Sequence, residues 1–257
     1  MIPKKIHYCW FGGNPLPESV KQYIASWEKY CPDYEIVEWN ERNFNVECNA
    51  YVKEAYQAKK WAFVSDVARL YALTNYGGIY MDTDVEIIRS LDSLLQYPAV
   101  VGFETKERLS TAFMACEAGN PLFLEFQKQY DDQHFLRTDG SYNLTTNVTR
   151  LTDLCTTYGL KKDGMQQLLN DVVVFPCDYF SPKDMETKEL HQTENTYAIH
   201  FFDGSWRSQE DLYIEKIGKK WKRIPLGSFI AKFIGIVKFR GLFAATRETF
   251  GWIARRK

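Results

Sequence analysis

Short apolar runs alternate, along most of the chain, with stretches in which apolar residues recur at helical spacing. The apolar runs end in Gly, Pro or polar turn residues and predict strands at residues 6–11, 34–39, 79–81, 99–104, 111–116, 172–175 and 197–202. The periodic stretches predict helices at residues 19–30, 60–75, 121–130 and 143–158. This alternation favours an α/β fold with a mainly parallel central sheet flanked by helices, and such sheets bind ligands at the carboxyl ends of their strands.

The helix predicted at 60–75 is followed closely by a pair of acidic residues. Gly77 and Gly78 end the helix, and the short strand at 79–81 runs straight into Asp82-Thr83-Asp84.

The earlier helix at 19–30 is expected to begin with Ser19 as its N-cap. The periodic face of the helix at 60–75 consists of Phe63, Val67, Leu70, Tyr71 and Thr74.

The composition is that of a globular protein. The 257 residues are 45% apolar, 25% charged and 16% aromatic, which excludes disordered, collagen-like and coiled-coil chains. This length suffices for one large α/β core. The aromatic share is high, and sites that stack flat rings or sugars often recruit aromatic residues.

The formal net charge of −1 hides a division along the chain. Residues 216–257 contain twelve Lys or Arg and one acid, Glu248, a charge of +11, so residues 1–215 carry −12. The sequence therefore predicts an acidic catalytic body at 1–215 and a basic tail at 216–257.

The tail combines its positive charge with apolar residues at helical spacing. This pattern is typical of an amphipathic helix in a membrane interface, where each basic residue contributes about 1 kcal/mol of attraction to anionic lipid. Two alternatives remain: a nucleic-acid patch, which would leave much apolar surface unused and which we do not expect, and a helix packed on the body's own acidic surface. The apolar residues are Phe229, Ile230, Phe233, Ile234 and Val237.

The sequence predicts a cytoplasmic protein attached peripherally to the inner face of the cytoplasmic membrane. Residues 1–10 contain Lys4, Lys5 and His7 and lack an apolar run of signal-peptide length, and no apolar segment is long enough to span a membrane. No pair or cluster of cysteines suggests a zinc site or a disulfide framework, so buried free thiols are expected. The cysteines are Cys9, Cys31, Cys48, Cys116, Cys155 and Cys177.

Two carboxylates follow the strand at 79–81. In extended backbone, Asp82 and Asp84 would point to the same side of the chain, about 5 to 7 Å apart, and would repel each other unless a cation lay between them. Carboxylate oxygens suit Mg²⁺ or Mn²⁺, ions that commonly bridge a protein to phosphate oxygens. A polar turn without a ligand is the alternative.

A second charged pair lies on the preceding helix. Asp66 and Arg69 are three residues apart, so they share one helix face, and they stand in a largely apolar stretch. An ordinary surface ion pair is one interpretation. The other is that both residues belong with Asp82 and Asp84 in one compact functional unit, because charges in an apolar stretch need a reason to be there.

The residues of this unit resemble a known family. The runs Ser65-Asp66-Val67-Ala68-Arg69-Leu70-Tyr71 and Tyr76-Gly77-Gly78-Ile79-Tyr80-Met81-Asp82-Thr83-Asp84, with the opening Ile2-Pro3-Lys4-Lys5-Ile6-His7-Tyr8, resemble the DXD-containing glycosyltransferases of bacterial capsule and lipopolysaccharide synthesis. These enzymes are related to the yeast initiation-specific mannosyltransferases and, more distantly, to the glucosylating domains of clostridial toxins. The resemblance implies a GT-A fold, a nucleotide-sugar donor and a divalent metal, usually Mn²⁺.

The resemblance also assigns roles to particular residues. It implies that Trp10 lies near the nucleotide base, that Asp66 and Arg69 hold the donor sugar, and that Asp82 contacts ribose, sugar or metal. Asp84 is then the firmest metal ligand, and a cation at that point would stabilise the charge of the departing diphosphate.

A further segment, Ile199-His200-Phe201-Phe202-Asp203-Gly204-Ser205-Trp206, resembles the part of related retaining transferases that closes over the diphosphate. The resemblance implies that neutral His200 is a metal ligand and that Ser205 and Trp206 donate hydrogen bonds toward the metal-bound phosphate. A packed histidine beside an aromatic turn is the alternative.

The sequence thus predicts a retaining, metal-dependent enzyme that moves a hexose from a UDP- or GDP-sugar to a glycan acceptor, expected to be lipid-linked. Residues 109–114 and 145–147 depart from the family pattern, which leaves the identity of the sugar open.

Glu104, at the end of a predicted strand, is a candidate to reach the acceptor; the alternative is a solvated carboxylate at a strand end. The alternatives are another metal-dependent sugar-phosphate or nucleotidyl transferase, and a non-catalytic membrane-bound glycan-binding module.

Overall fold

The computed structural model describes residues 1–204, 209–221, 224 and 226–246, and Ser205 and Trp206 lie outside this set. The chain divides into two compact units, Met1–Asp203 and Gly204–Lys257. The predicted boundary at 215/216 falls inside a helix of the second unit, α7 (Gln209–Trp221).

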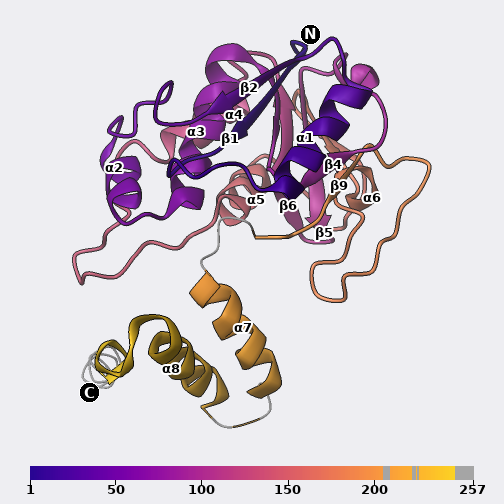
Figure 1. Ribbon diagram of the computed structural model, residues 1–257. Coiled ribbons are helices and arrows are strands. Elements are labelled where there is room, and N and C mark those ends of the chain that lie inside the picture. Colours follow the sequence, from indigo (N-terminus) through magenta and orange to yellow (C-terminus); the bar gives the residue numbers. More distant parts are fainter. Residues whose placement is uncertain (205–208, 222–223, 225, 247–257) are drawn as a thin grey trace. The chain divides into compact units, whose positions relative to one another are not determined.

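The first unit is built around a central sheet with helices packed on it (Figure 1). The sheet has seven strands in the order β2-β1-β3-β6-β5-β8-β7. Strands β2, β1, β3, β5 and β8 run in one direction, and β6 and β7 run in the other, so the predicted mainly parallel α/β sheet is confirmed. A separate two-stranded ribbon pairs β4 with β9. The strands are β1 (Lys5–Cys9), β2 (Glu35–Trp39), β3 (Gly78–Met81), β4 (Val85–Ile87), β5 (Ala99–Thr105), β6 (Arg108–Cys116), β7 (Gln167–Leu169), β8 (Val172–Phe175) and β9 (Ala198–His200).

Helices cover both faces of the sheet, so the central strands β3, β5, β6 and β8 are buried along nearly their whole length. Helices α2, α3, α4 and α5 pack on one face against Val101, Met114 and Val174, while α1 and α6 pack on the other against Val100 and Phe113. The helices of this unit are α1 (Glu18–Tyr30), α2 (Ala50–Gln57), α3 (Trp61–Tyr76), α4 (Pro121–Lys128), α5 (Asn147–Thr157) and α6 (Cys177–Phe180), with a 3₁₀ turn at Asp92–Leu94.

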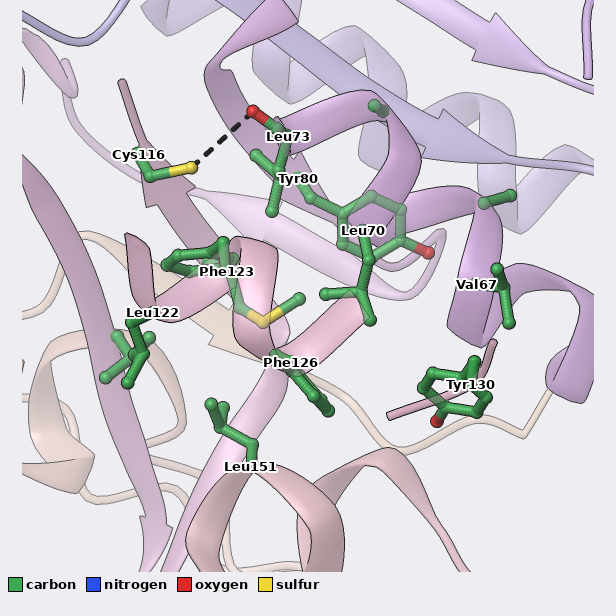
Figure 2. Close-up of a cluster of buried hydrophobic side chains, with 14 of the residues drawn as sticks. Val67, Leu70, Leu73, Tyr80, Cys116, Leu122, Phe123, Phe126, Tyr130 and Leu151 are labelled. Carbon is green, nitrogen blue, oxygen red and sulfur yellow. Dashed lines mark hydrogen bonds between the residues drawn. The ribbon is translucent and has the colours of Figure 1, made fainter. Parts of the chain in front are cut away.

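The core on the α3 side fixes the helix that carries Asp66 and Arg69. Figure 2 shows Leu70 and Leu73 of α3 beside Phe123 and Phe126 of α4, all fully buried. The Cys116 thiol of β6 donates a hydrogen bond to the Leu73 carbonyl, with an S···O distance of 3.7 Å. Because each such buried side chain contributes roughly 1.5–3 kcal/mol, α3 is held against the sheet by packing rather than by its own helix propensity.

Glycines make the passage from α3 into the sheet possible. Gly77 has φ +62° and Gly78 has φ +107°, values that L side chains rarely adopt. A Cβ on Gly77 would lie 2.7 Å from the backbone nitrogen of Ala118, and one on Gly78 would lie 2.8 Å from the Lys5 carbonyl oxygen. The chain can therefore turn sharply and insert β3 between β1 and β6, which places residue 82 at the carboxyl end of a central strand.

Several local predictions were wrong. Helix α1 begins at Glu18 after Pro17, which makes no side-chain cap, so Ser19 lies inside the helix instead of capping it. Cys48 is exposed, whereas Cys9, Cys31, Cys116 and Cys155 are buried as expected. Five helices or strands were not predicted: α2, β4, β7, α6 and α7. Of these, β4, β7 and α6 have only three or four residues, which is too short a pattern to read.

The second unit is described by itself and contains α7 and α8 (Gly227–Arg240). Gly227, Ala231 and Gly235 are buried on α8 at intervals of four residues. No helix among the residues described combines the length and the apolar character needed to cross a bilayer.

Candidate metal centre

A tight turn after β3 holds the two acidic residues of the sequence motif. The Val85 N–H donates to the Asp82 carbonyl oxygen at 3.1 Å, and the Asp82 N–H donates to the Ala112 carbonyl oxygen at 2.9 Å. The backbone from 82 to 85 is therefore a turn and not the extended segment that we expected, because the chain must reverse here to enter β4. The two carboxylates nevertheless approach each other.

The β4–β9 ribbon brings a histidine from far along the chain to the same point. Val85 pairs with His200, and the His200 Nε2 lies 3.4 Å from the Asp84 Oδ1. One ligand atom from each of Asp82, Asp84 and His200 can be chosen so that all lie within 4.8 Å of one another. The structure thus brings together the three residues expected to hold a metal.

Burial and charge set the ionisation of this cluster. The side chains of Asp84 and His200 are each 11% exposed. Burial by itself disfavours both charges, but the mutual contact outweighs it: the pKa of Asp84 lies below its ordinary value and that of His200 lies above it.

The donor atoms suit a hard or borderline divalent cation. Two carboxylates and one imidazole form a set that accommodates Mn²⁺ or Mg²⁺. The buried Nδ1 of His200 has no hydrogen-bond partner among the described residues. One ring nitrogen of His200 is thus unsatisfied in a buried position, and one ligand atom from each of the three side chains lies within 4.8 Å of the others, so the residues present fit a bound ion.

Next to this cluster, Arg69 joins two carboxylates. Its Nη2 lies 3.4 Å from the Asp66 Oδ1 and 3.2 Å from the Asp82 Oδ1, and its side chain is only 6% exposed. The guanidinium also donates to the Thr111 carbonyl oxygen at 2.8 Å and lies over the Tyr80 ring, 4.5 Å from the ring centroid. The prediction that Asp66 and Arg69 share a face is confirmed, and the interpretation as a surface ion pair is wrong because both residues are buried.

Asp66 is a carboxylate with spare hydrogen-bonding capacity. Burial raises its pKa to about 6, Arg69 opposes this rise, and the charge of Asp82 adds to it. Its carboxylate makes no hydrogen bond to a described residue beyond the ion pair with Arg69. Its backbone carbonyl accepts from the Asn147 side chain at 3.1 Å, and Asn147 in turn accepts from the Tyr130 hydroxyl at 2.6 Å. The scaffold therefore fixes Asp66 while leaving its oxygens available.

Helix α1 holds the ribbon that carries Asp84 and His200. The Trp27 indole N–H donates to the Val85 carbonyl oxygen at 2.8 Å, and the Tyr23 hydroxyl donates to the Asp203 Oδ2 at 2.7 Å. The Asp203 backbone N–H donates to the Asp84 Oδ2 at 2.9 Å. Sequence reasoning missed Tyr23, Trp27 and Asp203, because their contacts depend on tertiary packing; Tyr80, whose hydroxyl donates to the Asp82 Oδ1 at 2.8 Å, lay in the quoted motif without a role.

Two other predicted residues lie apart from this network of described contacts. Trp10 follows β1, is half-buried, and donates through its indole N–H to the Asn14 carbonyl oxygen at 2.6 Å. Its assignment to the nucleotide base stays a prediction. Glu104, near the end of β5, is half-buried; burial raises its pKa to about 7, while His200 lowers it and Asp82 raises it, so Glu104 responds electrostatically to the cluster.

The sequence around this site matches known proteins. Residues 17–101 match the model of a family described as "Glycosyltransferase sugar-binding region containing DXD motif". Inositol phosphoceramide mannosyltransferase 3 of Schizosaccharomyces pombe is 35% identical over 132 residues, which make up 48% of this chain and 36% of that protein. Mannosyl phosphorylinositol ceramide synthase SUR1 of Saccharomyces cerevisiae is 28% identical over 143 residues, 53% of this chain and 37% of that protein. The chain thus aligns with little more than a third of each of these relatives.

A solved structure titled "PaToxG Glycosyltransferase" is 20% identical and aligns with 61% of this chain and 68% of its own, with a TM-score of 0.47. Yeast mannosyltransferases are among the relatives, as the sequence resemblance implied. Residues 17–101, which carry Asp66, Arg69, Asp82 and Asp84, are thus similar to a glycosyltransferase sugar-binding region that contains a DXD motif.

Proposed function

We propose that this protein is a metal-dependent glycosyltransferase of GT-A type that moves a hexose from a UDP- or GDP-sugar to a glycan acceptor. The observation that carries the proposal is the convergence of Asp82, Asp84 and His200 within 4.8 Å of one another, beside the buried Asp66–Arg69 pair. The family match covers four of these five residues, and His200 comes from outside it.

Each residue of the site has its own role in the proposed reaction. The free oxygens of Asp66 accept hydrogen bonds from hydroxyl groups of the donor sugar, and Arg69 fixes Asp66 and Asp82 relative to each other. Asp82, Asp84 and His200 would hold Mn²⁺ or Mg²⁺, which when bound supplies positive charge to stabilise a diphosphate leaving group. The roles proposed for Ser205 and Trp206 at the phosphate, and for Trp10 at the base, belong to the same hypothesis.

We infer that the anomeric configuration is retained, which gives an α-linkage, and that the acceptor is lipid-linked. The resemblance to retaining transferases supports the first inference. The names of both yeast relatives, which contain the word ceramide, support the second. A role in surface polysaccharide synthesis at the inner face of the cytoplasmic membrane, with an anionic lipid surface as a partner, completes the proposal.

The test is a screen of UDP- and GDP-hexoses for Mn²⁺-dependent hydrolysis, with wild-type protein and Asp84→Asn compared. Release of nucleoside diphosphate by the wild type, lost in Asp84→Asn, is expected. Release of nucleoside monophosphate or pyrophosphate would instead identify a sugar-phosphate or nucleotidyl transferase. Glycan binding that persists in Asp84→Asn without any turnover of donor by the wild type would identify a binding module.

A further inference from the structure

The second unit presents apolar side chains that remain exposed after its own helices have packed. Leu226, Leu242 and Phe243 are 66%, 62% and 82% exposed, and Phe239, whose ring also contacts that of Tyr213 on α7, is 43% exposed. These residues lie at the two ends of α8, just before it and at or just after its last turn. Phe239, Leu242 and Phe243 fall within five consecutive residues, and large exposed apolar side chains gathered in this way mark an interaction surface.

Close packing between α7 and α8 decides which side of α8 remains available. A Cβ added to Gly235 would lie 2.1 Å from the Ile214 Cγ1, and one added to Gly227 would lie 2.0 Å from the Trp221 carbonyl oxygen. The small residues of α8 therefore form its contact with α7, and this contact leaves no room for larger side chains. The larger apolar residues Phe233 and Val237 of α8 are only partly buried.

Basic residues are frequent in the same unit as the exposed apolar side chains. Lys216, Lys220, Lys232 and Lys238 are exposed, and the sequence from 216 to 257 holds twelve basic residues against one acid. Lys238 also lies over the Tyr213 ring of α7, 3.7 Å from its centroid, so a charged group flanks the helix pair. Apolar side chains with basic residues around them match the interface of an anionic bilayer, where the former enter the headgroup region and the latter meet lipid phosphates.

We propose that α7 and α8 form a helical hairpin that docks on an anionic lipid surface through Leu226, Phe239, Leu242 and Phe243. The glycines of α8 lie at the contact between the two helices. The inference rests on the proposed membrane partner and deepens it by naming the surface. Because α7 and α8 pack against each other through small residues, the exposed apolar side chains are available without separation of the two helices. Docking therefore requires little rearrangement. A nucleic acid would match the charge but not the apolar side chains.

The experiment measures co-sedimentation of the full chain with phosphatidylcholine vesicles, with and without phosphatidylglycerol. Wild-type protein is expected to sediment with the anionic vesicles, and the double variant Leu242→Ser/Phe243→Ser to partition roughly tenfold more weakly or worse, since two large apolar contacts are lost. Lys220→Gln/Lys232→Gln is expected to weaken binding to vesicles that contain phosphatidylglycerol and to leave binding to pure phosphatidylcholine vesicles unchanged. Leu168→Ser, which changes a 67% exposed leucine of the first unit, is the matched control and is expected to bind like the wild type.

Sedimentation of Leu242→Ser/Phe243→Ser equal to that of the wild type would overturn the inference. So would a change from dimer to monomer in that variant with vesicle binding unaltered, because the surface would then join two copies of the chain. Nucleotide-sugar hydrolysis is measured on the same samples without vesicles and is expected to be equal in all variants. Absence of nucleotide-sugar hydrolysis from the wild type would refute the proposed activity. The vesicle result would still test the docking surface.

Discussion

The candidate site has two halves that are held in place in different ways. The donor half consists of Asp66, Arg69 and Asp82, which lie close together in the sequence and are fixed by a buried guanidinium and the core beneath α3. The ribbon half consists of Asp84 and His200, which the β4–β9 pairing joins across the length of the first unit. The donor half is therefore part of the core, whereas the ribbon half depends on a two-stranded ribbon and its contacts with α1.

The largest expected effect is in the donor half. Arg69→Met removes the only cation that the described structure places between Asp66 and Asp82, and leaves buried carboxylates facing each other. We expect a loss of roughly 3–5 kcal/mol in unfolding free energy, measured by urea denaturation. Adding Asp66→Asn to this variant is expected to restore part of the loss, and a double variant no more stable than Arg69→Met would contradict this account.

A smaller effect is expected from the support of the ribbon half. Tyr23→Phe removes the hydrogen bond to Asp203, whose backbone N–H donates to Asp84. We expect a stability loss of only about 1 kcal/mol but a several-fold weaker affinity for Mn²⁺, since outer contacts of metal ligands tune affinity. Tyr30→Phe on the same helix is the control, and equal Mn²⁺ affinities in the two variants would show that the contact between Tyr23 and Asp203 does not position the ribbon.

A pH-dependent effect is expected at Glu104, which responds to both halves. Its pKa is raised by burial from 4.5 to about 7, so the folded state favours the protonated carboxyl. Its contribution to stability is therefore fully present below pH 4.5 and is lost as the pH rises through about 7. Relative to Glu104→Gln, the wild type should lose of order 1–2 kcal/mol between about pH 5 and about pH 8, once solvent screening is allowed for. An equal difference at the two pH values would refute this.

The donor half could be predicted from the sequence because its information is local. Three-residue spacing on a helix places Asp66 beside Arg69, and the glycines after that helix deliver Asp82 to the end of β3. The sequence did not reveal that Arg69 also reaches Asp82, since that contact depends on how α3 packs against the sheet. The same limit applies to Asn147, which lies in a stretch noted only for departing from the family pattern yet holds the Asp66 backbone.

The ribbon half was less accessible to sequence reasoning. His200 was placed with the metal only through a family resemblance, because β4 is three residues long and gives no pattern that predicts its pairing with β9. The turn at 82–85 was mistaken for extended backbone for a related reason: the strand pattern ends before it and does not encode the reversal. From the sequence, Tyr23 and Trp27 look like ordinary core positions of an amphipathic helix. Only the fold shows that their side chains donate hydrogen bonds to Asp203 and to Val85 of β4.

The most direct test of the account is a titration of the protein with Mn²⁺, followed by electron paramagnetic resonance, for the wild type, Asp84→Asn and His200→Gln. Asp92→Asn, a change to an exposed acid elsewhere, is the control. The account predicts one tight Mn²⁺ site per chain that weakens by roughly 100-fold or more in both site variants, since even outer contacts of a metal ligand are worth roughly 10–100-fold. Wild-type affinity in either Asp84→Asn or His200→Gln would show that the two residues do not share an ion and would contradict it.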